Sequence, residues 1–388
     1  MKKLKVLYIS HSDPGLGGAP KSLVELINNL RSNYNVYPIV CVHSKDMVYN
    51  FCKRNNIECY VTGHEDVWTG GIKDPKAWLN WLPQKILLSV HNHEALKYLK
   101  EKIDIESIDI IHTNVSVVNF GMYVHKKYNI PHIMHLREDS DVLNNMLYTI
   151  RPVNCMNKFV TRFIAISDYV KSGWSKNKID SNKIDVIYNG LILPSYSRHR
   201  IFKDEKIKII MSGSLISDKG QDLVISAIKS MKSKYRDKIV LDIAGTGNKR
   251  YIKRLKKIIS ENNLKNVRLL GYQKNIANKL SKYDIGIMAS KGEAFGRVTV
   301  EYMANGLAVL ASDTGANKEI IKNKGTGFIF DRNNLKSLIK TLKYMIDNPI
   351  ETQNVACNGQ KEAYSRFTTD INASNIYEEY KKVLKLSK

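Results

Sequence analysis

The sequence has few cysteines, no long hydrophobic run and no recognisable signal peptide. Its cysteines are odd in number and scattered through 388 residues, and no two have metal-site spacing: Cys41, Cys52, Cys59, Cys155 and Cys357. A reduced, cytosolic protein is therefore the simplest interpretation. The longest apolar runs fall far short of the roughly 20 residues that cross a membrane. The basic start, MKKLKVLYIS, passes directly into a strand-like run and lacks a signal-peptide cleavage region.

Acidic residues are scarce relative to basic ones. Asp and Glu number 37 against 61 Lys and Arg, which leaves a formal net charge of +24. Such a charge indicates an anionic partner, namely nucleic acid, anionic lipid or a phosphorylated substrate. The alternative is a lysine-rich, solvated surface in a chain whose composition is biased toward Asn, Ile and Lys. No aromatic RNA-binding signature accompanies the charge, so we expect no nucleic-acid partner.

Short apolar runs alternate with helical patterns along the whole chain. The helical pattern is clearest at Leu335, Leu338, Ile339, Leu342 and Met345. Alternating strands and helices predict parallel sheets, and about six strands in each half predict two doubly wound α/β domains. The strand-like runs are 4–10, 36–42, 109–114, 131–136, 163–167 and 183–189 in the first half, and 207–213, 238–245, 266–272, 284–290, 307–313 and 327–330 in the second.

The two predicted domains are residues 1–190 and 205–367. The turn residues and charges of 189–206 favour a linker between them, and a second crossing is expected near 367–370. Residues 371–386 have an amphipathic pattern, which predicts a final helix.

One segment, 289–321, carries the clearest chemical pattern. Glu293 precedes a Phe-Gly break, after which small and apolar residues recur at helical spacing from Arg297 until Gly306, with Glu301 one turn into the helix. The first backbone N–H groups of such a helix attract phosphate. A helix end between two carboxylates suits a diphosphate that joins two polyols, as in a sugar nucleotide. The alternative is a surface turn with two solvated glutamates.

The residues around these glutamates resemble the donor-binding motif of the retaining family 4 glycosyltransferases, which have the GT-B fold. EAFGRVTVE, a small-residue helix, a glycine and then SDTGANKEII match that motif almost position by position. The resemblance covers nearly the whole chain. It is strong over 211–330 and looser before residue 189. It implies two Rossmann-like domains facing a cleft, with a C-terminal helix, 370–388, that crosses back to complete the first domain.

The resemblance also implies the donor site. Lys219 in MSGSLISDKGQD matches a lysine that contacts the donor diphosphate, where an ammonium offsets charge on the leaving group. Ser214 is a departure, because many relatives carry arginine there. Arg297 is a candidate substitute, and the alternative for it is an ion pair with Glu301. The implied donor-binding residues are Gly17, Gly18, Gly213, Ser214, Lys219, Gly245, Gly271, Tyr272, Glu293, Ala294, Phe295, Gly296, Arg297, Val298 and Glu301.

The glycine loop before the first helix, HSDPGLGGAPKS, is the weakest part of that set. It brings backbone N–H groups close to a phosphate, yet it is not a dinucleotide-binding G-x-G-x-x-G. A plain strand-to-helix loop is the alternative. It resembles the family's loop that lies against the donor phosphate and the acceptor.

Three residues at strand ends of the first domain are predicted to bind the acceptor. His135 and Arg137 end the run PHIMHLR, and ligands bind at the carboxyl ends of strands in open α/β sheets. Because the family places a histidine there, we expect His135 to orient an acceptor hydroxyl; His112 and His132 are less convincing. Ser167 matches a recurrent family segment, although a helix cap explains it equally well.

A stretch with Trp78, Trp81 and Lys85 has the pattern of an amphipathic segment. It predicts contact with a membrane interface, and ordinary core packing is the alternative. Pro83 is expected to interrupt any single helix here.

Together these observations predict a retaining glycosyltransferase. Glu293, His135 and Lys219 are its predicted catalytic residues. It would move a sugar from a nucleotide-diphosphate sugar, with UDP favoured, to a lipid-linked or saccharide acceptor in bacterial capsule, exopolysaccharide or lipopolysaccharide assembly. The product would be an α-linkage, made at the inner face of the membrane, and an anionic membrane surface is an expected partner. We recognise no acidic D-x-D metal motif, and relatives work without a metal, so no cofactor and no metal are expected.

Two alternatives remain at this stage. One is a sugar-nucleotide epimerase of the same fold, which would need a set of acids and histidines that we do not find. The other is a catalytically degenerate subunit that binds sugar nucleotide or glycan without transfer, and Ser214 is its only support.

Overall fold

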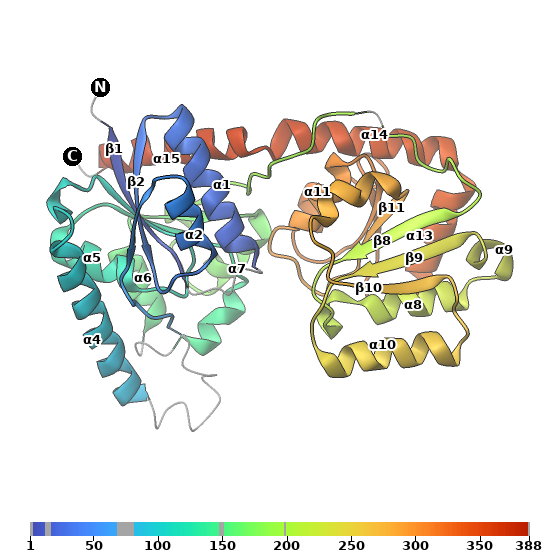
Figure 1. Cartoon of the computed structure of the whole chain (residues 1–388), viewed down its shortest axis with the longest axis horizontal. Helices are drawn as coiled ribbons and strands as arrows, with labels where there is room; N and C mark the ends of the chain where they lie inside the picture. The colour runs from blue at the N-terminus through green and yellow to red at the C-terminus, as the bar shows by residue number, and fades with distance from the viewer. Residues whose placement is uncertain (1–2, 12–16, 68–80, 147–150, 198, 387–388) are drawn as a thin grey trace. The chain divides into compact units, whose positions relative to one another are not determined.

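The computed structural model describes residues 3–11, 17–67, 81–146, 151–197 and 199–386. These residues form two compact units. The first comprises Met1–Gly190 together with Thr369–Lys388, and the second comprises Leu191–Thr368. The chain therefore passes twice from one unit to the other, at 190–191 and at 368–369 (Figure 1).

The first unit is built on a seven-stranded sheet in the order β3-β2-β1-β4-β5-β6-β7, and every neighbouring pair is parallel. Strand order reverses at β1 and β4, which is the switch point where doubly wound sheets bind ligands. The strands are β1 (Leu4–Ile9), β2 (Val36–Val42), β3 (Glu58–Val61), β4 (Ile110–Thr113), β5 (His132–Leu136), β6 (Arg162–Ala165) and β7 (Ile184–Val186). The helices are α1 (Gly18–Asn33), α2 (Met47–Arg54), α4 (Trp81–Lys100), α5 (Phe120–Tyr128), α6 (Pro152–Phe159), α7 (Asp168–Lys176) and α15 (Thr369–Leu386), with short 3-10 turns η1 (Ile105–Ser107), η2 (Ser140–Asn145) and η3 (Ser181–Lys183).

The second unit repeats this design with six parallel strands in the order β10-β9-β8-β11-β12-β13, so its switch point lies between β8 and β11. The strands are β8 (Ile207–Ser212), β9 (Ile239–Ala244), β10 (Val267–Gly271), β11 (Ile285–Met288), β12 (Ala308–Ser312) and β13 (Phe328–Phe330). The helices are α8 (Gln221–Ser230), α9 (Ser233–Arg236), α10 (Lys249–Glu261), α11 (Arg297–Ala304), α12 (Asn317–Ile320), α13 (Leu335–Asp347) and α14 (Pro349–Arg366), with η4 (Ser217–Lys219) and η5 (Ile276–Lys282).

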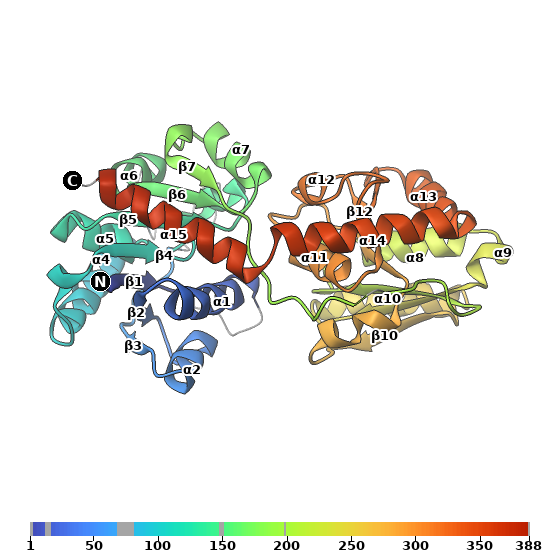
Figure 2. The same ribbon diagram turned by 90° about the horizontal axis from the view of Figure 1, so that it is seen from above.

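The last helix, α15, belongs to the core of the first unit. Its apolar face buries Ala373, Ile376, Tyr380 and Val383 in one cluster with residues of α1 and of the sheet. Figure 2 shows α15 and α1 lying together over that sheet. The crossing of the C-terminal helix back to the first domain, expected from the sequence, is therefore present.

Most predicted elements are found, and two expectations were wrong. All six strands of the second half and the helix over 335–345 form as the apolar patterns indicate. The first unit has a seventh strand, β3, that was not predicted. Pro83 does not interrupt a helix, because α4 runs unbroken from Trp81 and places Pro83 in its first turn, where a missing N–H costs no intrahelical bond.

Two further sequence predictions concern membranes. No helix among the described residues is long and apolar enough to cross one. Trp78, which was predicted to lie at a membrane interface, falls outside the described residues, as does the side chain of Trp81.

Candidate functional site

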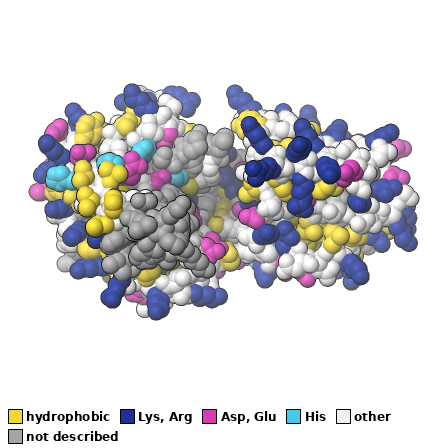
Figure 3. Space-filling view, turned by 90° about the horizontal axis from the view of Figure 1, so that it is seen from below, with side chains coloured by type: hydrophobic (Ala, Val, Ile, Leu, Met, Phe, Trp, Pro, Cys, Tyr) yellow, Lys and Arg dark blue, Asp and Glu magenta, His cyan; other side chains and the backbone are white. Residues whose placement is uncertain are grey.

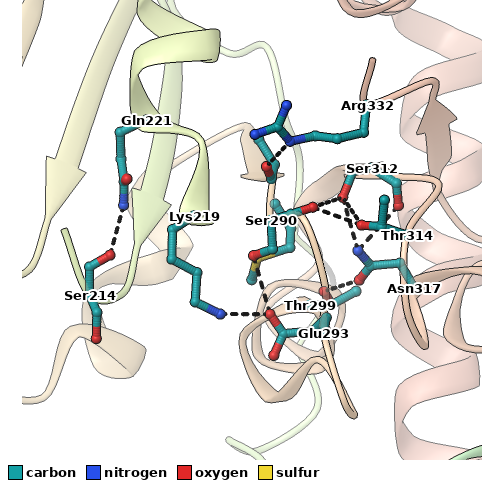
Figure 4. Close-up of polar contacts among 12 residues, drawn as sticks. Ser214, Lys219, Gln221, Ser290, Glu293, Thr299, Ser312, Thr314, Asn317 and Arg332 are labelled. Carbon is teal, nitrogen blue, oxygen red and sulfur yellow. Dashed lines mark hydrogen bonds and ion pairs between the residues drawn. The ribbon is translucent and has the colours of Figure 1, made fainter. Parts of the chain in front are cut away.

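The switch point of the second unit carries an ion pair. Lys219 ends η4, on the connection that leaves β8, and Glu293 lies in the loop after β11. Lys219 Nζ lies 2.8 Å from Glu293 Oε2, and the two side chains are 29% and 17% exposed. Ser290 Oγ donates to the same carboxylate oxygen at 3.2 Å (Figure 4). Two predicted catalytic residues, 74 positions apart, are thus brought together where α/β sheets bind ligands.

Hydrogen bonds from the next strand hold the loop that carries Glu293. Thr314 Oγ1 and Ser312 Oγ donate to the Ser290 carbonyl at 2.7 and 2.8 Å, and Ala316 N donates to the Glu293 carbonyl at 2.8 Å. Gly315, with φ of 58°, passes so close that a Cβ there would lie 2.3 Å from the Glu293 carbonyl oxygen. The Glu293 backbone is therefore fixed from both sides, which leaves only its side chain free to adjust.

Helix α11 begins beside Glu293, as the sequence predicts. Gly296 is the N-cap, with φ of 93°, and it makes no side-chain cap. A helix start of this kind offers backbone N–H groups and a partial positive charge to an anion. Arg297 Nε lies 3.3 Å from Glu301 Oε1, and both side chains are about one-sixth exposed, at 17% and 16%. The ion pair considered as the alternative for Arg297 is thus present in this structure.

Glycines bring the loops after β8 and β9 into contact. A Cβ on Gly245, which has φ of 146°, would lie 1.9 Å from the Gly213 carbonyl oxygen, and one on Gly220 would lie 2.3 Å from the Ala289 carbonyl oxygen. No other residue fits at these two crossings without moving backbone. They place the carboxyl ends of β8, β9 and β11 side by side.

The other predicted donor residues of this unit differ in exposure. Ser214 is exposed, and its carbonyl accepts a hydrogen bond from Gln221 Nε2 at 3.0 Å. Tyr272, just after Gly271 at the end of β10, is 65% exposed. The Phe295 ring is buried against Phe367, with centroids 5.8 Å apart, so only its backbone is available to a ligand. Ala294 and Val298 are half-buried beside it.

In the first unit, the predicted residues also lie at the carboxyl edge, and His135, Arg137 and Ser167 among them are buried. Gly17 and Gly18 follow β1, and Gly17 caps α1 without a side chain. Arg137 is 8% exposed and donates from Nε to the carbonyl and to the Oδ1 of Asn114, and from its guanidinium to Asn189. The Ser167 hydroxyl accepts from Val170 N at 3.1 Å and so caps α7. The structure assigns Arg137 and Ser167 these supporting contacts, and their binding of an acceptor stays a prediction.

His135 is almost completely enclosed. It is 1% exposed, its Nδ1 lies 2.7 Å from His112 Nε2, and its Nε2 is buried with no hydrogen-bond partner among the described residues. Burial lowers the pKa of His135 well below its usual range, so the ring is neutral near pH 7. Neighbouring Glu138 also titrates abnormally, because burial raises its pKa although Ser116 donates to it at 2.9 Å.

Contrary to the expectation from sequence, one D-x-D triplet is present, at Asp139-Ser140-Asp141. Asp139 caps η2 and accepts a hydrogen bond from the Tyr169 hydroxyl. Within the described ranges, no group of three or more His, Cys, Asp or Glu side chains is arranged to hold a metal ion.

Sequence reasoning missed several residues that build both edges. Ser312, Thr314 and Asn317 support the Glu293 loop, and Asn317 Oδ1 also accepts from Thr299 of α11 at 3.1 Å. Their only signal was membership of the segment SDTGANKEII. Asn114 had no sequence signal and His112 had only a weak one, because their partners lie 23 or more positions away.

Comparison with known proteins now adds to this geometry. The family model "Glycosyl transferases group 1" matches residues 195–362, and "Glycosyltransferase Family 4" matches residues 16–193. An uncharacterized glycosyltransferase of Methanocaldococcus jannaschii is 26% identical over 294 residues, which is 74% of this chain and 79% of that protein. The capsular polysaccharide biosynthesis glycosyltransferase CapM of Staphylococcus aureus is 23% identical over 217 residues, 55% of this chain and 53% of its own length.

Among solved structures, Anabaena HepE in complex with UDP has a TM-score of 0.78 at 20% identity, covering 98% of this chain and 100% of HepE. HepE has also been solved with UDP-glucose. At this identity the likeness shows the fold alone. The two sheets described above and the two domain models, which between them span nearly the whole chain, lead to one conclusion: this chain is a glycosyltransferase of the GT-B fold, whose first part matches the family 4 model and whose second part matches the group 1 model.

Proposed function

We propose that this glycosyltransferase moves a sugar from a UDP-sugar, with retention of the α configuration, to a lipid-linked or saccharide acceptor during assembly of a bacterial surface polysaccharide. The observation that carries the proposal is the Lys219–Glu293 pair at the switch point, beside the uncapped start of α11. It combines a cation, an acceptor of hydrogen bonds and a helix N-terminus within one edge of one sheet.

These groups match the parts of a sugar nucleotide. The Lys219 ammonium has three N–H donors and the Glu293 carboxylate about four lone pairs, so each has capacity beyond their mutual contact. Lys219 and the α11 N-terminus would bind the diphosphate and stabilise charge on the leaving group. Glu293 would hold hydroxyls of the transferred sugar, and Glu301, one turn into α11, would hold the ribose. Because Lys219 and the α11 N-terminus supply positive charge, the proposed reaction takes no metal.

The preference for UDP and for polysaccharide assembly rests on relatives. HepE has been solved with UDP and UDP-glucose, and CapM is named for capsular polysaccharide biosynthesis. We also propose that the protein contacts an anionic membrane surface, which rests on two observations on this chain. The net charge is +24, and α4 exposes Leu82, Ile86, Leu87 and Val90 on an apolar stripe. Figure 3 shows hydrophobic side chains gathered on the first unit and many lysines and arginines on the second.

Donor binding is the direct test. Calorimetry with UDP, GDP and ADP, followed by UDP-glucose, should give binding that is tightest for the uridine nucleotides and weaker in Glu293→Gln only when the sugar is attached. Glu261→Gln, on the exposed end of α10, is the matched control and should change neither affinity. Retention is tested by the anomeric configuration of the product in proton NMR. A β-linked product, or no binding of any nucleoside diphosphate, would overturn the proposal.

A binding subunit without transferase activity is the second candidate, and Ser214 is the observation behind it, because family relatives often carry a cation there. Slow release of free sugar from a labelled donor distinguishes the two, since only a catalyst hydrolyses the donor. Hydrolysis by the wild type that is lost in Glu293→Gln supports the enzyme, and binding without hydrolysis supports the subunit.

A further inference from the structure

Four buried aromatic side chains of the first unit form a continuous hydrogen-bonded chain that ends at His135. His135 Nδ1 lies 2.7 Å from His112 Nε2, His112 Nδ1 lies 2.6 Å from the Tyr380 hydroxyl, and this hydroxyl donates to Tyr8 Oη at 3.1 Å. All four residues are at most 1% exposed. The chain joins β1, β4 and β5 to α15, which is the last helix of the protein.

The direction of these hydrogen bonds follows from counting protons. A phenol has one proton, and Tyr380 gives its proton to Tyr8, so the Tyr380 oxygen can only accept from His112. His112 Nδ1 must then carry the N–H. A neutral imidazole has a single N–H, so His112 Nε2 is bare and accepts from His135 Nδ1. His135 therefore has its proton on Nδ1 and a bare lone pair on Nε2.

Both rings are neutral, as this counting requires. Burial lowers the pKa of His112 to about 3 and lowers that of His135 well below its usual range, and the nearby Arg137 cation adds to the effect in each case. A folded-state pKa this low keeps each ring in its neutral form throughout the physiological pH range. Because neither ring takes up a second proton, neither can donate from both nitrogens, and the direction of the hydrogen bonds stays fixed.

We propose that Tyr380 and His112 are positioning residues that hold His135 as its Nδ1–H tautomer, so that Nε2 accepts a hydrogen bond from a substrate hydroxyl. The Nε2 atom is buried without a partner among the described residues, and a buried acceptor that the protein leaves unpaired calls for an outside donor. A hydroxyl of a sugar is such a donor. Only this last step rests on the proposed function, whereas the tautomer follows from the protein alone.

The tautomer can be measured directly on the full chain. In protein labelled with ¹⁵N-histidine, the protonated ring nitrogen and the bare one resonate far apart, and the signals of His135 are identified by their loss in His135→Gln. We expect the wild type to have Nδ1 protonated and Nε2 bare. A wild-type His135 with its proton on Nε2 would overturn the proposal without any variant or assay.

Two substitutions that remove one hydroxyl each disturb the direction of these hydrogen bonds. In Tyr8→Phe, the Tyr380 proton loses its acceptor and turns to His112 Nδ1, which moves the N–H of both histidines to Nε2. In Tyr380→Phe, His112 Nδ1 loses its acceptor, so neither direction of the His112–His135 hydrogen bond is favoured and His135 populates both tautomers. Tyr377→Phe is the matched control, because Tyr377 lies on the same helix, 5.0 Å from Tyr34 in ring contact, outside the chain. It should leave His135 unchanged, and unchanged His135 signals in both test variants would also overturn the proposal.

Assays of sugar transfer then test whether the tautomer of His135 matters for the reaction. If Nε2 accepts from a substrate hydroxyl, Tyr8→Phe should lose about tenfold in turnover, as expected for one hydrogen bond, and Tyr380→Phe should lose less, while Tyr377→Phe keeps wild-type turnover. A tautomer that reverses without loss of turnover would refute the role of Nε2 in transfer. The proposed UDP-sugar donor is tested apart from this, because donor binding by the second unit does not depend on the His135 tautomer.

Discussion

The carboxyl edges of the two sheets present their polar groups in opposite ways. In the second unit, Lys219 and Glu293 are partly exposed and share a single ion-pair contact. In the first unit, Arg137 and His135 are at most 8% exposed and are held by several neighbours. The same sheet design therefore yields one edge whose charges can rearrange around a ligand and one edge whose groups are fixed. Substitution of Lys219 or Glu293 should accordingly affect chemistry, and substitution of Arg137 should affect stability.

The largest effect on transfer is expected from Glu293→Ala. Losing a charged hydrogen bond to the sugar should raise the activation barrier by about 2–4 kcal/mol, because its backbone is fixed and no neighbour can replace it. Initial rates with a labelled UDP-sugar measure this, with Glu261→Ala as the control. Near-normal turnover in a folded Glu293→Ala would show that the exposed edge is not the reactive one.

Arg137→Lys tests the same comparison in the first unit, where we expect a loss of stability. Lysine lacks the planar fork, so acceptors on Asn114 and Asn189 lose buried partners, at a cost of about 2–3 kcal/mol in the free energy of unfolding. For a unit of this size that is a fall of roughly 5–10 °C in melting temperature. Calorimetry measures it, and Arg54→Lys, exposed on α2, should be neutral. Unchanged stability would mean that the first edge is not held by its own contacts.

Lys219→Ala should weaken binding of free UDP by about 1.5–3 kcal/mol, as expected for one hydrogen bond to a charged group. The contrast predicts little change in melting temperature, since an ion pair open to water contributes about 0–1 kcal/mol. Isothermal calorimetry and thermal unfolding measure the two effects, with Lys318→Ala on α12 as control. Equal UDP affinity in the variant would place the diphosphate elsewhere.

The smallest expected effect sharpens the comparison within the second unit. Arg297 pairs with Glu301 in this structure, and if that is its whole role, Arg297→Gln should cost only a few tenths of a kcal/mol of stability. If Arg297 also supplies the cation missing at Ser214, UDP affinity falls and Ser214→Arg restores part of it. A double-mutant cycle distinguishes these outcomes, because independent sites give additive effects.

What could be predicted from sequence follows the same division. The second unit was predicted strand by strand, and α11 begins at Arg297 as expected, because its motif lies in one contiguous segment whose apolar spacing and glycines act locally. In the first unit, β3 is only four residues, ECYV, and begins with a glutamate, so it lacks the apolar run that reveals a strand. His112 seemed unconvincing from sequence because its partner Tyr380 lies 268 positions away. A contact between residues that lie far apart in the sequence leaves no local sequence pattern.

The return of α15 to the first unit has a consequence for biosynthesis. A ribosome makes the residues of the second unit before it makes Ile376 and Tyr380, which complete the hydrophobic core of the first. The unit that is translated second can therefore fold while the unit that is translated first still lacks one of its helices. Until α15 has emerged, α1 and β1 of the first unit stay incompletely covered. The N-terminal half is therefore accessible to chaperones and proteases during synthesis. For this enzyme, the order of translation and the order of folding run in opposite directions.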